Sequence, residues 1–228
     1  MSETFASVSQ VNEAVVACEK CPRLRQYCAG VAHDKRRAFR DDEYWGKPLP
    51  GFGDPDAQVL IVWLAPAAHR GNRTGRMFTG DRSGDFLYAS LHRAGWANQP
   101  TSIDRADGLT LNGVYITAAG RCAPPDNKPT PDELANCRPY LIQELRVLKK
   151  VCAIVALGQI AFDSVLAALP EVGVAIFKPR PAFGHNLAYR LQHYTLIASY
   201  HPSQRNTSTK LLTPPMFDAV FERARLAL

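Results

Sequence analysis

The chain lacks any long apolar segment. No stretch approaches the ~20 consecutive apolar residues of a membrane-spanning helix, and the polar residues 1–4 do not resemble the start of a secretory signal peptide. Internal repeats and low-complexity tails are also missing from the sequence. We therefore expect a soluble, cytoplasmic, monomeric protein without a membrane partner, whose 228 residues form the single domain 1–228.

Acidic residues are in the minority. The 21 Asp and Glu residues are outnumbered by 27 Lys and Arg residues, which leaves a net charge of +6. The cations gather in two groups, and such clustering favours contact with phosphates over a merely solvated basic face. The groups are Lys35, Arg36, Arg37 and Arg40, and then Arg70, Arg73 and Arg76.

Cysteine is scarce, and a second tight pair is missing. Cys18 and Cys21 form one C-x-x-C motif, whereas Cys122 and Cys137 are separated by fourteen residues that include a proline-rich stretch. This spacing argues against a zinc ribbon, which uses two tight pairs. Four thiolates from two distant segments are compatible with a [4Fe–4S] cluster or with an all-thiolate zinc site.

Two cysteines fall outside this pattern. Cys152 lies in the apolar run 151–157, so we expect it to be a small core residue. Cys28 is either a spare thiol or an alternative ligand.

Four apolar runs alternate with segments of helical pattern. The runs are 59–64, 114–118, 151–157 and 194–199, and the helical segments are 85–94, 131–150, 159–169 and 215–228. Thr130 and Glu133 fit a capping box at the start of the second helical segment. Strands that alternate with helices indicate a parallel sheet covered on both faces. The sequence thus predicts an α/β protein with a mainly parallel, four-stranded sheet.

The loop 65–81 is the most informative segment, because it is strongly polar and follows the apolar run 59–64. Open α/β sheets bind ligands at the carboxyl ends of their strands. The glycines of the loop allow tight turns and let backbone N–H groups approach an anion. Phe78 offers a flat apolar face, and Asp81 offers a base or a charge stabiliser. The loop therefore suits a planar, polar ring carried on a phosphate backbone.

His201 follows the last apolar run, so we expect it on the same rim of the sheet as the loop 65–81. A histidine at the end of a strand is more often structural, but its place beside Phe78 and Asp81 favours a functional role. Pro202 is expected to start a turn, and Ser203 is able to cap the segment that follows.

These motifs resemble those of the uracil-DNA glycosylase superfamily, most closely its family 5, the type b branch. The resemblance covers nearly the whole chain. It rests on Leu-Ala-Pro-Ala-Ala-His at 64–69, Gly-Asn-Arg-Thr-Gly-Arg-Met-Phe-Thr-Gly-Asp at 71–81, Arg-Cys-Ala-Pro-Pro-Asp-Asn-Lys-Pro-Thr-Pro at 121–131, His-Pro-Ser at 201–203, and the four cysteines. Trp63 and Arg70 depart from the family pattern, since relatives usually carry glycine at both places.

The resemblance implies a three-layer α/β/α sandwich around a central parallel sheet, and monofunctional removal of uracil from DNA. It also implies a structural [4Fe–4S] cluster held by Cys18, Cys21, Cys122 and Cys137. Type b enzymes accept other damaged bases, including hypoxanthine and ethenocytosine, so that a roomy pocket is implied.

Individual roles follow from the same resemblance. Phe78 would stack on the flipped base, Asn127 would hydrogen-bond its edge, and His201 would donate to uracil O2. Asp81 would act on water or on the sugar cation. Ala65 and His69 of the first motif would line the base site.

Contacts with DNA are expected from two sets of residues. Lys35, Arg36, Arg37, Arg73 and Arg76 would bind phosphates, so affinity should fall steeply with salt. The segment Ser203, Gln204 and Arg205 would press into the duplex, as the resemblance implies.

Two other functions stay open at this point. A catalytically weak module that binds damaged DNA is kept open by Trp63, because a bulky side chain beside the pocket would obstruct a base. A hydrolase or transferase acting on free nucleotides is less favoured, since the chain lacks a Walker lysine and an evident carboxylate pair for Mg²⁺.

Overall fold

The computed structural model describes residues 5–228, and the polar segment 1–4 lies outside them. Six strands form one sheet in the order β1-β3-β2-β4-β6-β5. The four inner strands are parallel: β3 (Val114–Ala118), β2 (Val59–Trp63), β4 (Ala153–Leu157) and β6 (Tyr194–Ser199). Two short strands, β1 (Phe52–Gly53) and β5 (Ala188–Leu191), pair antiparallel at the edges.

The prediction of a four-stranded sheet is therefore wrong in number, although each predicted run contains a parallel strand. The two missed strands lack the apolar pattern of a buried strand. β1 has only two residues, and in β5 only Leu191 is buried while Ala188 and Arg190 are exposed. Edge strands with one open side do not need a continuous apolar run.

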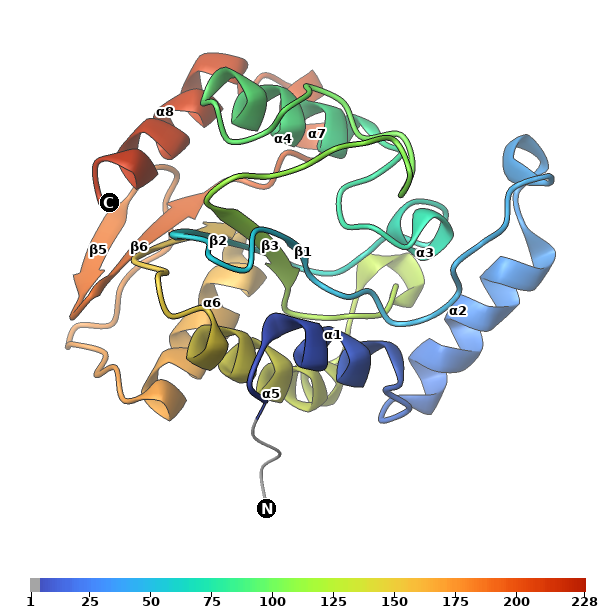
Figure 1. Cartoon of the computed structure of the whole chain (residues 1–228), viewed down its shortest axis with the longest axis horizontal. Coiled ribbons are helices and arrows are strands. Elements are labelled where there is room, and N and C mark those ends of the chain that lie inside the picture. Colours follow the sequence, from blue (N-terminus) through green and yellow to red (C-terminus); the bar gives the residue numbers. More distant parts are fainter. Residues whose placement is uncertain (1–4) are drawn as a thin grey trace.

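Helices cover both faces of the sheet, with α4 and α8 on one face and α1, α5 and α6 on the other (Figure 1). This arrangement confirms the predicted three-layer α/β/α sandwich. The helices are α1 (Val8–Val16), α2 (Pro22–Asp34), α3 (Gly71–Thr74), α4 (Arg82–Arg93), α5 (Pro131–Val147), α6 (Gln159–Ala168), α7 (Gln204–Ser208) and α8 (Pro214–Arg225), with short 3₁₀ turns at Arg37–Phe39, Pro125–Asn127 and Leu169–Val172. Within residues 5–228, no helix is both long and apolar enough to cross a membrane.

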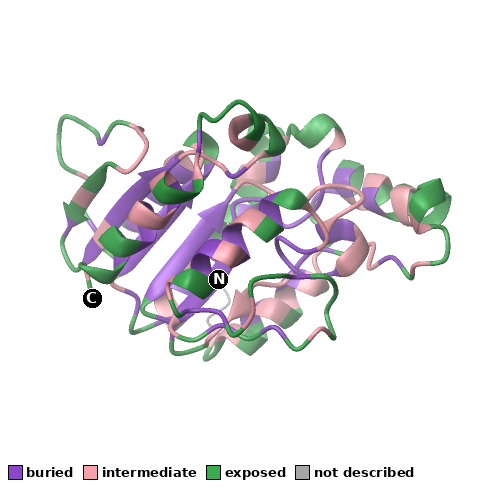
Figure 2. Cartoon of the chain, turned by 90° about the horizontal axis from the view of Figure 1, so that it is seen from above, coloured by how far each residue is buried: buried purple, intermediate pink, exposed green. Residues whose placement is uncertain are grey.

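The four inner strands of the sheet are almost completely buried, as the purple arrows in Figure 2 show. Successive side chains of a strand point to opposite faces. In β2, Ile61 and Trp63 therefore join the core beneath α4 and α8, whereas Leu60 and Val62 join the core beneath α5 and α6. Trp63, the last residue of β2, thus lies in the same core cluster as Phe78.

The predicted capping box starts α5. The Thr130 hydroxyl accepts from the Glu133 backbone N–H, and the Glu133 carboxylate accepts from the Thr130 backbone N–H at 2.8 Å. Arg23 on α2 donates two further hydrogen bonds to Glu133, at 2.8 and 2.7 Å. This contact joins α2 to α5, so that Cys21 at the start of α2 and Cys137 within α5 belong to neighbouring elements.

Candidate active site

A cavity of about 610 Å³ opens at the carboxyl ends of the parallel strands. The loops after β2, β3 and β6 supply most of its walls, and Tyr27 and Arg36 reach it from the N-terminal part of the chain. Seven predicted site residues line it: Ala65, His69, Asp81, Asn127, His201, Ser203 and Gln204. Residues that are more than a hundred positions apart in the sequence therefore meet around one space, which is large enough for a small ligand.

His201 lies in the loop after β6, which forms one wall of the cavity. Burial lowers the pKa of its imidazole to about 4, although the nearby charge of Asp81 raises the pKa. Asn206 donates a hydrogen bond of 2.8 Å to the backbone carbonyl of His201, which fixes the loop. The imidazole is therefore neutral at pH 7 and offers one N–H donor to a bound group.

Asp81 holds the start of α4. Its Oδ1 accepts from the Gly84 backbone N–H at 2.7 Å, as an N-cap residue does, and its Oδ2 lies 3.0 Å from Nη1 of Arg70. The carboxylate is thus kept at the cavity wall by a cap and by an ion pair. Sequence reasoning assigned Asp81 a chemical role but missed both structural partners.

Phe78 does not line the cavity. Its side chain is only 2% exposed, and its backbone has φ of +54°, a left-handed conformation that is rare for an aromatic residue. Gly84 permits this packing, because a Cβ at Gly84 would lie 1.8 Å from the Phe78 carbonyl oxygen. The expected open Phe78 face is therefore not found: the aromatic residue of this core that reaches the cavity wall is Trp63.

His69 is the second histidine of the cavity. Its Nδ1 lies 2.9 Å from the Tyr44 hydroxyl. Burial lowers the pKa of the imidazole, and the charges of Arg36 and Arg73 lower it further. Tyr44 is a contact that the motif pattern did not reveal, because it lies 25 residues upstream in an irregular segment.

The cysteines lie near one another around the loop after β3, which contains Cys122. Cys21, Cys28 and Cys122 share one buried cluster, and Cys28 and Cys122 are close enough to hydrogen-bond. Cys137 interacts electrostatically with Cys18, Cys21 and Cys122. The four cysteines predicted as ligands therefore lie in one region of the fold, and Cys28 lies beside Cys122 in the same region. In the described range 5–228, no three acidic, histidine or cysteine side chains converge closely enough for a single metal ion.

The buried guanidinium of Arg121 indicates which kind of bound group fits the cysteine region. One of its nitrogens donates to Glu144 at 2.5 Å, but Nε and Nη1 have no hydrogen-bond partner among the described residues. Its charge also acts on the Cys137 thiol. Buried N–H groups without a partner are costly, so the arrangement suits an anionic thiolate-bound group such as an iron–sulfur cluster.

Comparison with known proteins agrees with this site. Residues 50–225 match the model of the uracil DNA glycosylase superfamily. The chain belongs to this superfamily. It is 52% identical over 227 residues to the type-5 uracil-DNA glycosylase of Mycobacterium leprae, which covers 99% of this chain and 97% of the relative.

More distant relatives extend the match. The type-5 uracil-DNA glycosylase of Thermus thermophilus is 48% identical over 219 residues, covering 94% of this chain and 96% of the relative. A type-4 uracil-DNA glycosylase of Pyrobaculum aerophilum is 31% identical over 160 residues, covering 70% of this chain and 64% of the relative.

Two arginines that were predicted to bind DNA form ion pairs within the protein instead. Arg76 is 5% exposed and donates to Asp107 at 2.6 Å, to Ser102 at 2.7 Å and to Thr79 at 3.0 Å. The prediction that Arg76 contacts phosphate is therefore wrong for this structure, because its charge is buried and neutralised.

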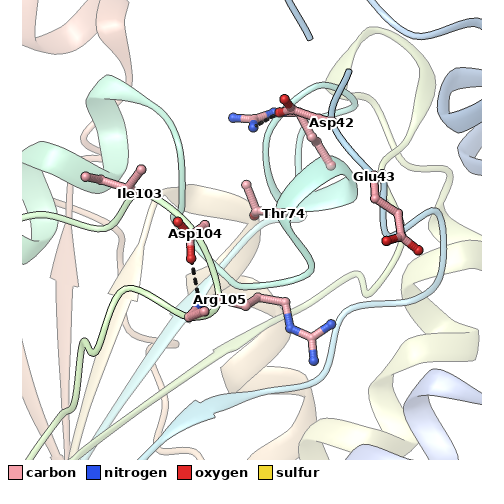
Figure 3. A pocket seen from close by; sticks show the side chains of 8 residues that line it. Asp42, Glu43, Thr74, Ile103, Asp104 and Arg105 are labelled. Atoms are coloured by element: carbon pink, nitrogen blue, oxygen red, sulfur yellow. Dashed lines mark hydrogen bonds and ion pairs between the residues drawn. The ribbon is translucent and has the colours of Figure 1, made fainter. Parts of the chain in front are cut away.

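Arg73 lines a second cavity of about 500 Å³, not the cavity that holds His201. Figure 3 shows the carboxylates of Asp42, Glu43 and Asp104 around this space. Nη1 of Arg73 lies 2.5 Å from Asp42, and its guanidinium stacks over the Phe39 ring. The prediction of a phosphate contact by Arg73 is thus also not supported, since a carboxylate already neutralises it.

The remaining predicted DNA contacts are accessible. Arg36, Arg37, Gln204 and Arg205 are exposed, and Lys35 is half-buried with its Nζ bonded to the Arg40 carbonyl. Ser203 caps α7 as expected, since its hydroxyl accepts from the Asn206 backbone N–H. Outside the site, Cys152 is only partly buried, so its predicted place in the core is corrected: it precedes β4 rather than belonging to it.

Proposed function

We propose that the protein is a monofunctional DNA glycosylase that removes uracil from DNA by hydrolysing the N-glycosidic bond, which leaves an abasic site for base excision repair. The observation that carries this proposal is the meeting of His201, Asp81 and Asn127 around one cavity at the strand ends. The type-5 uracil-DNA glycosylases to which the chain is similar support the same activity.

The reaction requires the nucleotide to leave the duplex, because the anomeric carbon cannot be reached in a stacked helix. Breaking the bond places negative charge on uracil and positive charge on the sugar. The neutral His201 donates to the developing uracil anion, as a preorganised donor does in an oxyanion hole. The Asn127 amide, exposed at the cavity mouth, hydrogen-bonds the edge of the base.

Asp81 acts on the sugar side. Its ion pair with Arg70 and its cap on α4 hold the carboxylate in one orientation at the cavity wall. A fixed negative charge there opposes the oxocarbenium ion or orients the attacking water. Because Asp81 needs no movement for this role, its placement reduces the reorganisation that accompanies bond cleavage.

Hypoxanthine and ethenocytosine belong to the proposal as further substrates. A cavity of about 610 Å³ falls within the usual range for whole small-molecule ligands, so a bicyclic base has room. We expect the enzyme to act on duplex DNA as a monomer in the cytoplasm, a reducing compartment that disfavours disulfides between its six cysteines.

A [4Fe–4S] cluster bound by Cys18, Cys21, Cys122 and Cys137 is part of the proposal. When bound, it cross-links the start of α2, the loop after β3 and α5, and it supplies no chemistry to the reaction. Its negative charge would pair with the buried Arg121 guanidinium, two of whose nitrogens lack partners within residues 5–228.

The test is single-turnover cleavage of labelled duplexes that contain one uracil, hypoxanthine or ethenocytosine, with and without alkali. Strand breaks that appear only after alkali are expected, since a monofunctional glycosylase leaves the sugar backbone intact. His201→Ala should slow uracil release more than it weakens binding. Binding of damaged duplexes without cleavage of any base would instead establish the binding module, which the covered Phe78 face favours.

A further inference from the structure

The ring of Phe78 is covered by another side chain of the same chain. The Trp63 indole lies over it with a centroid separation of 4.1 Å and an angle of 35° between the ring planes. The imidazole of His201 is nearly parallel to both rings, at 6.2 Å from Trp63 and 5.9 Å from Phe78. Since His201 is about equally far from the two stacked rings, it lies beside the stack and not on top of it.

These are the surroundings that the proposed reaction requires of uracil. A flipped base is held by stacking on aromatic side chains and by hydrogen bonds to its edge, and His201 is the edge donor of the proposed reaction. The indole has Phe78 on one face and His201 at its flank. Trp63 therefore occupies the position in which a base would contact both residues.

Packing holds the indole in that position. Strand alternation directs Trp63 into the core beneath α4 and α8, and its side chain is only 6% exposed. Its Nε1–H donates to Sδ of Met77 at 3.1 Å. A thioether is a weak acceptor, so that this bond is a small obstacle to displacement. The ring contact of the indole with Phe78 is of the kind that an incoming base is able to replace.

We propose that Trp63 is a specificity-determining residue that fills the base-stacking position and is displaced by the base. The inference rests on the proposed function, because it assigns the stacking position within that site. A base that enters must replace the contacts of a buried tryptophan with Phe78. Trp63 thereby weakens base capture and disfavours bases that stack poorly.

A different role for Trp63 has the opposite consequence. If the indole were itself the platform for the base, it would present a broad face to the cavity and its removal would weaken capture. An exposed fraction of 6% leaves too little of the residue accessible for a base to stack on it. Displacement, in contrast, predicts that a smaller residue at position 63 strengthens capture.

The experiment compares the metal-loaded wild-type protein with Trp63→Ala and Trp63→Phe. The first readout is affinity for a duplex with a non-cleavable 2′-fluoro-deoxyuridine relative to a matched thymidine duplex, and the second is the single-turnover rate on uracil. Trp63→Ala should improve both by about tenfold or more, with Trp63→Phe in between. Trp96→Ala is the control, since Trp96 is 7% exposed in the same core and does not line the cavity.

A third readout does not depend on activity. In a Trp45→Phe, Trp96→Phe background, Trp63 is the remaining tryptophan of the chain, and its emission should shift when the fluorinated duplex binds. Weaker or unchanged capture by both Trp63 variants, or an emission that stays constant on binding, would overturn the inference. If neither the wild-type protein nor the variants cleave uracil, the proposed function fails. The emission and affinity readouts would still test whether a bound base displaces the Trp63 indole.

Discussion

Nη1 of Arg70 lies 3.0 Å from Oδ2 of Asp81, so an ion pair joins the loop after β2 to the start of α4 inside the candidate active site. The other oxygen of Asp81 caps α4 through Gly84. One carboxylate therefore has a structural task and a proposed chemical task. Substitutions that remove its charge but keep its shape separate the two.

Asp81→Asn should keep the cap and lose the charge. We expect the single-turnover rate on uracil to fall by at least about 10²-fold, as for loss of a positioned acid–base group, with a small loss of stability from the weakened ion pair with the partly exposed Arg70. Asp81→Ala should lose the same activity and also destabilise the fold by about 1 kcal/mol, because the N-cap is removed. Asp85→Asn is the matched control, because Asp85 lies in the first turn of α4 and is itself exposed. Full activity of Asp81→Asn would move the carboxylate role to another residue.

His201 should make the stability of the protein depend on pH. Burial holds the pKa of its folded form at about 4, below the 6.5 of an unperturbed imidazole. Between these values the unfolded chain binds a proton that the folded chain does not. The free energy of unfolding therefore decreases as pH falls from about 6.5 to about 4, and the contribution is fully present above 6.5.

His201→Gln removes this contribution, and urea unfolding at several pH values measures it. The pKa values of Asp107 and Glu133 are lowered, so both also destabilise the protein in acid, and the comparison with the variant is needed to isolate His201. We expect a shallower pH dependence for His201→Gln over this interval. Parallel pH profiles for the two proteins would show that the imidazole is not buried in its neutral form.

Local patterns predicted most of the fold. The inner strands are continuous apolar runs, and the capping box at Thr130 and Glu133 depends on residues three positions apart. β5 was not predicted, because this edge strand contains the exposed Arg190 and has no continuous apolar run. His201 and Asp81 were placed on one rim because both follow parallel strands, whose carboxyl ends share one edge of the sheet.

Long-range pairings could not be predicted from the sequence. Arg76 belonged to an apparent basic cluster, but its charge is neutralised by Asp107, which lies 31 residues further on. The contact between Trp63 and Phe78 likewise depends on strand alternation and on the left-handed backbone of Phe78. Such features follow from the folded arrangement and not from any motif.

Arg36 and Arg76 should respond differently to removal of their charge. Arg36 is exposed at the cavity, so Arg36→Ala should weaken binding to any duplex and reduce the salt slope by about one. Arg76→Ala should leave the slope unchanged but destabilise the fold by about 1.5–3 kcal/mol, because Asp107 loses its charged donor while it keeps three backbone N–H donors. Fluorescence anisotropy of a labelled duplex across salt concentrations, with urea unfolding, measures both effects. A reduced salt slope for Arg76→Ala would reinstate it as a phosphate contact.

Serine substitutions should identify the cysteines that hold the cluster. Cys122→Ser removes a proposed ligand, so the purified protein should lose its broad visible absorption and part of its iron. Cys28→Ser is the matched control: Cys28 is fully buried and lies beside Cys122, but it is not in the proposed set. We expect Cys28→Ser to keep about four iron atoms per chain, the complement of a [4Fe–4S] cluster. Loss of iron in Cys28→Ser but not in Cys18→Ser would show that Cys28, and not Cys18, is the fourth ligand. Stoichiometric zinc in a colourless wild-type protein would replace the cluster with an all-thiolate zinc site.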